Sequence, residues 1–258
     1  MEIQSISTIE LDPFLRVALV GNSGSGKTYC LHTLPGKTLV LTFDPGGINS
    51  LLGRFNIDFV DYSKATPESW KRFDKDFTTL IDSPKQSYDN LVIDSLTKLQ
   101  DRILDYTVTE PTTATWKRAR MGERKLSLEA DYGFLIDVTN WIIDNFLSLK
   151  CNTILTAHIQ LFEDKLTSSI TQMPLIVGKK APGRFGIPFD EVYFCDIDPK
   201  FAGTNGRIWR TKRFGNVEFI KSRIEGLPEV LPQDFTEIIR YRQLMIERRK
   251  EKNDASYT

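Results

Sequence analysis

The sequence predicts an α/β fold with a mostly parallel central sheet and helices on both of its faces. Short apolar runs, typical of buried strands, alternate with amphipathic stretches of helical period from residue 16 to residue 158. Strand-like segments after residue 200 predict an antiparallel pair that extends the edge of this sheet. Because no stretch rich in proline, glycine or serine divides the chain, we expect one domain over residues 1–240 and a charged, flexible tail over residues 241–258.

The composition is that of an ordinary globular protein and says little about partners. Hydrophobic residues make up 40% of the 258 residues, and 34 Lys and Arg balance 34 Asp and Glu, so only local charge can indicate a partner. The N-terminal residues lack the basic and apolar regions of a secretory signal, and no apolar run reaches the roughly 18 residues that span a membrane. The three cysteines are widely spaced and typical of buried thiols in a reducing compartment. We therefore expect a cytoplasmic protein without membrane contact.

The first expected strand, residues 16–20, runs into a glycine-rich loop that fits G-x-x-x-x-G-K-[ST] at every fixed position, and a helix should open after it at residue 29. Glycines in such a loop let successive backbone N–H groups converge on one phosphate, and the helix N-terminus adds its positive end. Lys27 would reach the β- and γ-phosphates, and the Thr28 hydroxyl would take a position on Mg²⁺. The residues predicted to bind ATP are Gly21, Asn22, Ser23, Gly24, Ser25, Gly26, Lys27, Thr28 and Tyr29.

Two more strands and a helix are expected next. Residues 37–43 and 57–61 are predicted strands. Thr66, Pro67 and Glu68 then begin a helix with an N-cap hydroxyl, a proline in the first position and an acid in the first turn. The apolar face of this helix consists of Trp70, Phe73, Phe77, Leu80 and Ile81.

The apolar run at residues 91–93 ends in Asp94 and predicts a second part of the phosphate site. A carboxylate at the C-terminal end of a buried parallel strand, beside a phosphate loop, holds the water shell of Mg²⁺. We therefore predict Thr28 and Asp94 as the metal-binding residues.

The alternation of expected strands and helices continues in the second half of the chain. A helical stripe starts at Leu96, and a long helix with Leu128, Tyr132 and Leu135 on its apolar face follows. Residues 152–158 are a strand that ends on His158, and residues 160–186 are polar and poorly patterned. Strands are expected at 192–197, 207–211 and 217–221, the last two joined by a turn at 213–216, and a final helix opens at residues 231–235.

Taken in this order, the chain resembles the RecA-fold P-loop ATPases, in particular the compact phage-type ATP-binding proteins of the single-strand annealing and recombination class. The resemblance covers roughly residues 14–240. Its most specific parts are residues 21–28, 88–96, 156–158, 189–192, 220–223 and 226–228. It implies an ATPase that acts on single-stranded DNA in phage-type recombination, annealing or replication, in the host cytoplasm if a phage encodes it.

The resemblance also implies roles for three residues outside the phosphate loop. His158 sits where RecA-like cores keep a polar side chain that senses the γ-phosphate. Lys221 and Arg223 look like the paired cations that such proteins insert into the nucleotide site of a neighbouring subunit, where they neutralise charge on the transferred phosphoryl group. A homo-oligomer with shared nucleotide sites is therefore expected.

One position departs from the family pattern. RecA-like proteins usually carry a glutamate at the end of the second strand to orient the attacking water, whereas this chain has Asp44 followed by Pro45 and Gly46. Asp44 would serve with a shorter reach. Hydrolysis is thus less strongly predicted than nucleotide binding.

A basic segment indicates contact with nucleic acid. Residues 113–128 hold five cations against the single acid Glu123, for a net charge of +4, and include Trp116. Cations neutralise phosphates, and an aromatic ring can stack on any base. The segment has the position of the first DNA-facing loop of the RecA fold, and residues 160–178 that of the second. The residues predicted to bind single-stranded DNA are Trp116, Lys117, Arg118, Arg120, Arg124 and Lys125.

Two other interpretations stay open at this stage. A P-loop phosphotransferase acting on a small molecule would use the segment 116–125 as a lid. A nucleotide-dependent scaffold without turnover would account for the missing glutamate. The two cations Lys221 and Arg223, which lie late in the chain, favour the interpretation as a DNA-binding ATPase.

Overall fold

The structure is a computed structural model of the whole chain. It describes residues 12–83, 86–109, 120–121, 124–125, 129–164, 168–178, 181–201 and 205–255.

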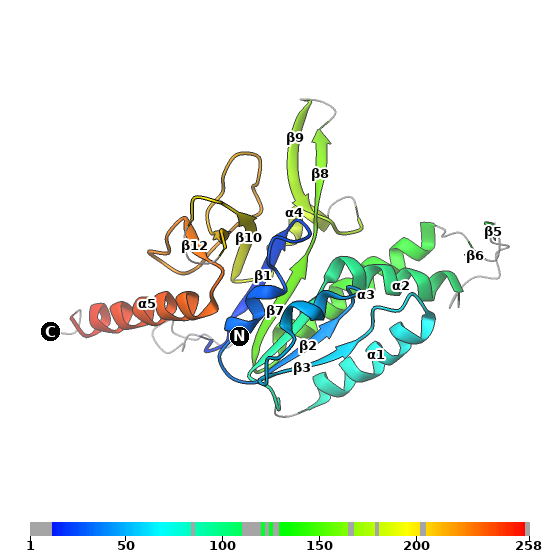
Figure 1. Cartoon of the computed structure of the whole chain (residues 1–258), viewed down its shortest axis with the longest axis horizontal. Helices are drawn as coiled ribbons and strands as arrows, with labels where there is room; N and C mark the ends of the chain where they lie inside the picture. Colours follow the sequence, from blue (N-terminus) through cyan, green and yellow to red (C-terminus); the bar gives the residue numbers. More distant parts are fainter. Residues whose placement is uncertain are drawn as a thin grey trace, which may run out of the picture.

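A single eight-stranded sheet forms the centre of the molecule, in the order β12-β11-β10-β1-β7-β4-β2-β3 (Figure 1). Strands β10, β1, β7, β4, β2 and β3 run parallel to their neighbours, and β11 and β12 add an antiparallel edge. This confirms the predicted α/β fold with an antiparallel extension. The strands are β1 (Arg16–Gly21), β2 (Thr38–Thr42), β3 (Ile57–Asp61), β4 (Asn90–Asp94), β7 (Asn152–Ala157), β10 (Glu191–Ile197), β11 (Arg207–Arg210) and β12 (Val230–Pro232).

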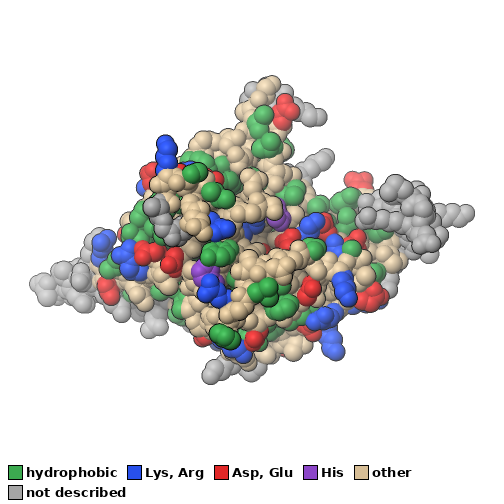
Figure 2. Space-filling model, viewed as in Figure 1, with side chains coloured by type: hydrophobic (Ala, Val, Ile, Leu, Met, Phe, Trp, Pro, Cys, Tyr) green, Lys and Arg blue, Asp and Glu red, His purple; other side chains and the backbone are tan. Residues whose placement is uncertain are grey.

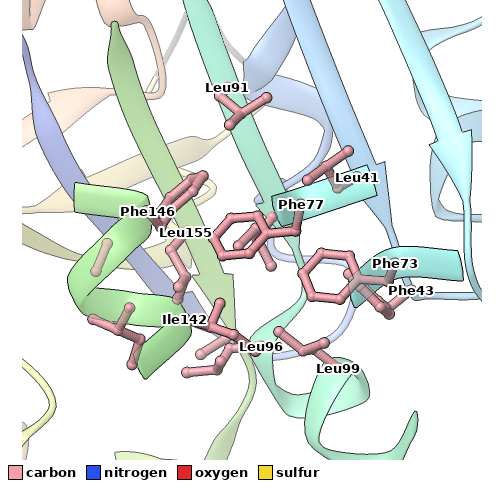
Figure 3. Close-up of a cluster of buried hydrophobic side chains, with 14 of the residues drawn as sticks. Leu41, Phe43, Phe73, Phe77, Leu91, Leu96, Leu99, Ile142, Phe146 and Leu155 are labelled. Atoms are coloured by element: carbon pink, nitrogen blue, oxygen red, sulfur yellow. The ribbon is translucent and has the colours of Figure 1, made fainter. Parts of the chain in front are cut away.

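Helices cover both faces of this sheet. On one face α1 (Pro67–Asp82), α2 (Leu96–Thr109) and α3 (Glu129–Ser148) lie side by side. Their aromatic and aliphatic side chains pack against the sheet as Figure 3 shows, with Phe73 and Phe77 of α1 between the strands and α2. On the other face, the short 3₁₀ helices η2 (Tyr29–Thr33) and η3 (Gly47–Leu51) and the start of α5 (Phe235–Ala255) cover a second core.

The predicted apolar faces are confirmed with one exception. Trp70, Phe73 and Phe77 are buried in α1, as is Leu135 in α3. Tyr132, which was placed on the apolar face of α3, is 38% exposed. Leu128 lies outside the described residues.

The helix expected to open at residue 29 is short. It is the single 3₁₀ stretch Tyr29–Thr33, and Leu34 already has an extended backbone. Pro35 explains this, because the residue before a proline is forced out of the helical region. The phosphate loop is therefore followed by one short helical turn.

The expected strand at residues 217–221 is wrong. That segment makes only isolated bridges, including one between Lys221 and Val192, and β11 pairs instead with β12. The reason lies in β11, the expected partner, whose two edges are taken by β10 and β12. The segment 217–221 instead bridges to the beginning of β10 at Val192.

The stretch at 160–186 also differs from expectation. Instead of an unpatterned loop it contains the hairpin β8 (Ile159–Asp164) and β9 (Ser169–Pro174), which projects at the top of Figure 1, and the short α4 (Ala181–Arg184). Figure 2 shows hydrophobic side chains on this projection, and Leu161, Phe162 and Ile170 are exposed there.

A helix crosses the boundary that was expected at residue 240. Helix α5 runs from Phe235 to Ala255, so the expected division at residue 240 falls inside it. Met245, beyond that division, is buried. Among the described residues, no helix is long and apolar enough to span a membrane.

Candidate nucleotide-binding site

The carboxyl ends of four neighbouring parallel strands meet at one cavity of about 350 Å³. Ligands of open α/β sheets bind at this edge, where strand ends leave polar groups unpaired. The phosphate loop leaves β1, Asp44 follows β2, Asp94 ends β4 and His158 follows β7. The cavity is lined by Ser23, Gly24, Gly26, Lys27, Thr28, Tyr29, Asp44, Pro45, Gly46, Gly47, Ser50, Asp94, His158 and Arg207.

The loop needs glycine at two kinds of position. Gly24 and Gly26 have φ values of 78° and 95°, in the left-handed region that side chains disfavour. At Gly21 the backbone conformation is ordinary, but a Cβ would lie 2.5 Å from the carbonyl oxygen of Cys195 on the adjacent strand. The glycines are therefore required by the curled backbone of the loop and by its close approach to β10.

Lys27 is held at the floor of the cavity. It is only 6% exposed, and its Nζ donates to the carbonyl oxygens of Gly21 at 2.9 Å and Asn22 at 2.8 Å. Burial lowers the pKa of this ammonium group, and the carboxylates of Asp94 and Asp44 partly offset that effect. Of the predicted loop residues, Gly21, Asn22 and Ser25 do not line the cavity.

Asp94 lies fully buried next to the loop. Its Oδ2 accepts from the Thr28 hydroxyl at 2.7 Å, and its Oδ1 accepts from the Thr156 hydroxyl at 2.5 Å. Burial raises the pKa of the Asp94 carboxyl, and the two hydroxyl donors counteract part of the rise. The predicted pair of Thr28 and Asp94 is thus within hydrogen-bonding distance. Thr156 was not predicted as a site residue, although it lies in the segment 156–158 that carries part of the family resemblance.

Asp44 and His158 lie next to each other, and both line the cavity. The distance from His158 Nε2 to Asp44 Oδ1 is 3.5 Å. Burial alone would raise the pKa of Asp44, but hydrogen bonds from His158 and Ser95 lower it overall, so the carboxylate is favoured. The sequence named these two residues separately, and the structure brings them together.

Gln233 is a site residue that the sequence did not indicate. It is 4% exposed, and its Nε2 donates to the carbonyl oxygens of Ser25 at 2.7 Å and Ile208 at 2.9 Å. One side chain therefore ties the phosphate loop to β11. No motif marks it, because a glutamine more than 200 residues from the loop reaches it only through the fold.

Lys221 and Arg223 lie away from this cavity. Lys221 pairs with Val192 near the beginning of β10, and Arg223 Nη1 contacts Asp190 Oδ1 at 2.8 Å. The beginning of β10 is the opposite edge of the sheet from the phosphate loop, since β10 and β1 are parallel. Neither cation lines the cavity of its own chain.

The same edge carries a buried acid. Glu191 is 2% exposed and accepts from the Tyr193 hydroxyl and from the Arg223 backbone N–H. Burial raises its pKa, and the hydrogen bonds from Ser222, Tyr193 and Arg223 counteract that rise only in part.

The predicted DNA-binding segment is largely outside the described residues. This holds for Trp116, Lys117 and Arg118. The backbones of Arg120–Met121 and Arg124–Lys125 form the short antiparallel strands β5 and β6. Figure 2 shows acidic and basic side chains interspersed on the viewed face of the described protein, without a large surface of one sign.

Comparison with known families and proteins agrees with this geometry. A family model described as an AAA domain matches residues 14–218 of the 258. No curated protein matches the sequence. The matched region contains every residue that lines the cavity, whereas Lys221, Arg223 and Gln233 lie beyond it.

Glu191→Gln should remove a pH-dependent loss of stability. Because the pKa of Glu191 is raised in the folded state, that state binds the proton more tightly than the unfolded chain, and stability falls as pH rises from the unfolded to the folded pKa. The unfolding free energy of the variant relative to the wild type should therefore increase over this range, starting at about pH 4.3, and then level off. Urea unfolding at several pH values measures it, with the exposed Glu229→Gln as control. A difference that does not change with pH would contradict the assignment.

Proposed function

The chain belongs to the AAA domain family of P-loop ATPases, and from this premise we propose that it binds ATP with Mg²⁺ and hydrolyses it to act on single-stranded DNA. Nucleotide binding follows from the family. The observation that supports this particular site most strongly is that Lys27, Thr28 and Asp94 meet at one cavity beside the curled glycine loop.

The residues present fit a triphosphate and its metal ion. The curled backbone at Gly24 and Gly26 would present N–H groups to the phosphates, and Lys27 adds a positive charge whose side chain is already held in place. Thr28 and Asp94 supply the hydroxyl and carboxylate oxygens that Mg²⁺ prefers in such sites. The bound Mg²⁺ would neutralise charge on the phosphates.

Lys27→Ala should weaken ATP–Mg²⁺ binding by about 10- to 100-fold, the range for a lost hydrogen bond to a charged group. Isothermal titration calorimetry measures it directly. The matched control is Lys212→Ala, because Lys212 is exposed and pairs with Glu229 away from the cavity. Equal affinity in the Lys27 variant and the wild type would exclude this loop as the phosphate site.

For hydrolysis we propose that Asp44 and His158 act as a pair. The Asp44 side chain is shorter than that of a glutamate, but its carboxylate lies 3.5 Å from the His158 ring, which also lines the cavity. Asp44 would orient the ring, and His158 would orient the attacking water and respond to the γ-phosphate.

Asp44→Asn and His158→Gln should each lower the rate of ATP turnover by about 100-fold or more, since a positioned acid–base group contributes roughly that factor. ATP affinity should stay close to that of the wild type in both. Steady-state phosphate release and calorimetry separate the two effects. Turnover at the wild-type rate in both variants would rule out the pair as the water-orienting group.

We further propose that the protein assembles so that Lys221 and Arg223 enter the nucleotide site of a neighbouring subunit. Their position away from the cavity of their own chain supports this, as does the 66% exposure of the Arg223 side chain. A cation that arrives from a neighbour would neutralise charge on the transferred phosphoryl group.

Subunit mixing tests the shared site. Lys27→Ala and Arg223→Ala should each be inactive alone, because each lacks one half of every site. Mixed together they should recover part of the turnover, since some interfaces then combine an intact loop with an intact cation. No recovery at any mixing ratio would contradict the assignment in trans.

For single-stranded DNA we propose contact through residues 116–125, in phage-type recombination, annealing or replication. The support is the net charge of +4 over residues 113–128 in a chain whose total charge is zero. Cations there would release counterions from the phosphates, and Trp116 would stack on bases.

The double variant Arg118→Ala, Arg120→Ala should flatten the salt dependence of DNA binding. The logarithmic slope on a single strand is about −0.7 per neutralised phosphate, so the loss of two contacts should reduce it by roughly 1.4. Fluorescence anisotropy of an unstructured oligonucleotide, titrated with salt, measures the slope. Arg240→Ala and Arg213→Ala together serve as the control. An unchanged slope would favour a phosphotransferase that acts on a small molecule.

A further inference from the structure

A cavity of about 510 Å³ lies between α3 and the segment that follows β9. Its walls are mostly apolar and include Ile136, Ile143, Ile176, Phe185 and Ile187. Gln100 and Thr139 also line it, and the Gln100 amide nitrogen donates to the Thr139 hydroxyl at 3.2 Å. The Gln100 amide oxygen accepts from the backbone N–H of Val177 at 2.9 Å. Because these polar groups already have partners, the cavity suits an apolar occupant better than a hydrogen-bonding ligand.

The hairpin β8–β9 presents an apolar face to solvent. Leu161 is 69% exposed and Ile170 is 52% exposed. Across the ladder Leu161 is opposite Gln172, and Glu163 is opposite Ile170. Since side chains two positions apart or directly opposite lie on the same face, Leu161, Glu163 and Ile170 share one face. A two-stranded hairpin is at best marginally stable alone in water, so a partner surface would stabilise it.

The apolar cavity adjoins the two cations that are proposed to act in a neighbouring subunit. Ile187 lines the cavity and is 66% exposed, so it lies at the rim. Lys221 Nζ donates to the carbonyl oxygen of Ile187 at 2.9 Å. Pro188 lines this cavity and also a second one, of about 750 Å³, which Arg223 lines as well. One side of the molecule therefore carries both cations and the apolar cavity.

The hairpin, in turn, emerges from the nucleotide site. Strand β8 begins directly after His158, which lines the nucleotide cavity. The backbone N–H of Leu175, just beyond β9, donates to the carbonyl oxygen of His158 at 2.7 Å, so both strands are anchored there. A neighbour that inserts Lys221 and Arg223 into the nucleotide cavity would therefore bring its apolar cavity to the side from which the hairpin projects (Figure 1).

We propose that the hairpin of one subunit docks in the apolar cavity of a second copy of this chain, with Leu161 and Ile170 inserted. This rests on the proposed function, because the partner is the neighbour that supplies Lys221 and Arg223. Hairpin and cavity are different surfaces of the same chain, so the contact is heterologous. It repeats from copy to copy and builds a ring or a filament.

Charge sets the orientation of the docked hairpin. Glu163 is exposed on the same face as the two apolar side chains. Arg184 of α4 and Asp144 of α3 both line the cavity and are exposed. The Glu163 carboxylate is attracted by Arg184 and repelled by Asp144, so the hairpin enters with Glu163 on the Arg184 side.

Cross-linking between two different variants tests the contact. Full-length Leu161→Cys and Ile187→Cys chains, mixed and oxidised, should form a disulfide-linked dimer. Both positions are exposed, whereas the native cysteines are buried. Each variant alone should give much less dimer, because only the mixture brings a hairpin cysteine to a cavity cysteine. The control mixture replaces Ile187→Cys by Phe55→Cys, which is fully exposed just before β3.

Self-association gives a second measurement, by sedimentation velocity over a range of protein concentrations. Leu161→Asp and Ile187→Asp should each weaken it by about 10- to 150-fold, the range for loss of one buried aliphatic side chain. ATP affinity should not change in either variant, because neither residue lines the nucleotide cavity. Phe55→Asp is the control. Glu163→Arg should also weaken self-association, and adding Arg184→Glu should restore part of the loss.

Absence of the mixed cross-link, or self-association that both aspartate variants leave unchanged, would overturn the docking. If Leu161→Asp instead weakens only the binding of single-stranded DNA, the hairpin is a DNA contact and the proposal fails. Recovery of turnover on mixing Lys27→Ala with Arg223→Ala, without the cross-link, would overturn this contact and keep the shared nucleotide site. The cross-link without that recovery would support the docking and contradict only the shared site.

Discussion

The buried carboxylate of Asp94 is the group on which the candidate site depends. It lies at the end of β4 with 1% exposure, and hydroxyl groups from the phosphate loop and from β7 donate to its two oxygens. A charged group in this position is costly unless it is hydrogen-bonded, and its raised pKa reflects that cost. The arrangement holds a negative charge where a metal ion would stabilise it. It also fixes Thr28, and with it the end of the loop, relative to the sheet.

The two faces of the sheet contribute differently to the site. The helices α1, α2 and α3 form the larger apolar core and hold β2, β4 and β7 in register, so that Asp44, Asp94 and His158 emerge side by side. The other face carries little helix near the loop, because Pro35 ends η2 after one short turn. On that face the antiparallel edge of the sheet supports the phosphate loop instead, because Gln233 connects the two by hydrogen bonds. Packing of the helices therefore positions the acidic residues of the site, and the hydrogen bonds of Gln233 position the phosphate loop.

The sequence was informative where a function needs particular residues at short range. The glycine loop, Lys27 and Thr28 follow from a local pattern, and the strand before Asp94 follows from its apolar run. The contact between Asp44 and His158 could not be predicted, since it depends on β2 and β7 lying on either side of β4. Gln233 was missed for the same reason.

The errors have local physical causes as well. Residues 217–221 have the alternation of a strand, but β11, with which they were expected to pair, already has β10 on one side and β12 on the other. The hairpin β8–β9 exposes the apolar side chains of Leu161, Phe162 and Ile170, so its apolar residues do not mark one buried face. A strand that is not half buried gives no clear period of two.

The most direct test of the account is a crystal structure of the chain with a non-hydrolysable ATP analogue and Mg²⁺. It should place the phosphates against the backbone of residues 24–28 and the metal ion beside Thr28 and Asp94. A metal ion bound away from both residues, or phosphates outside the glycine loop, would contradict the central claim.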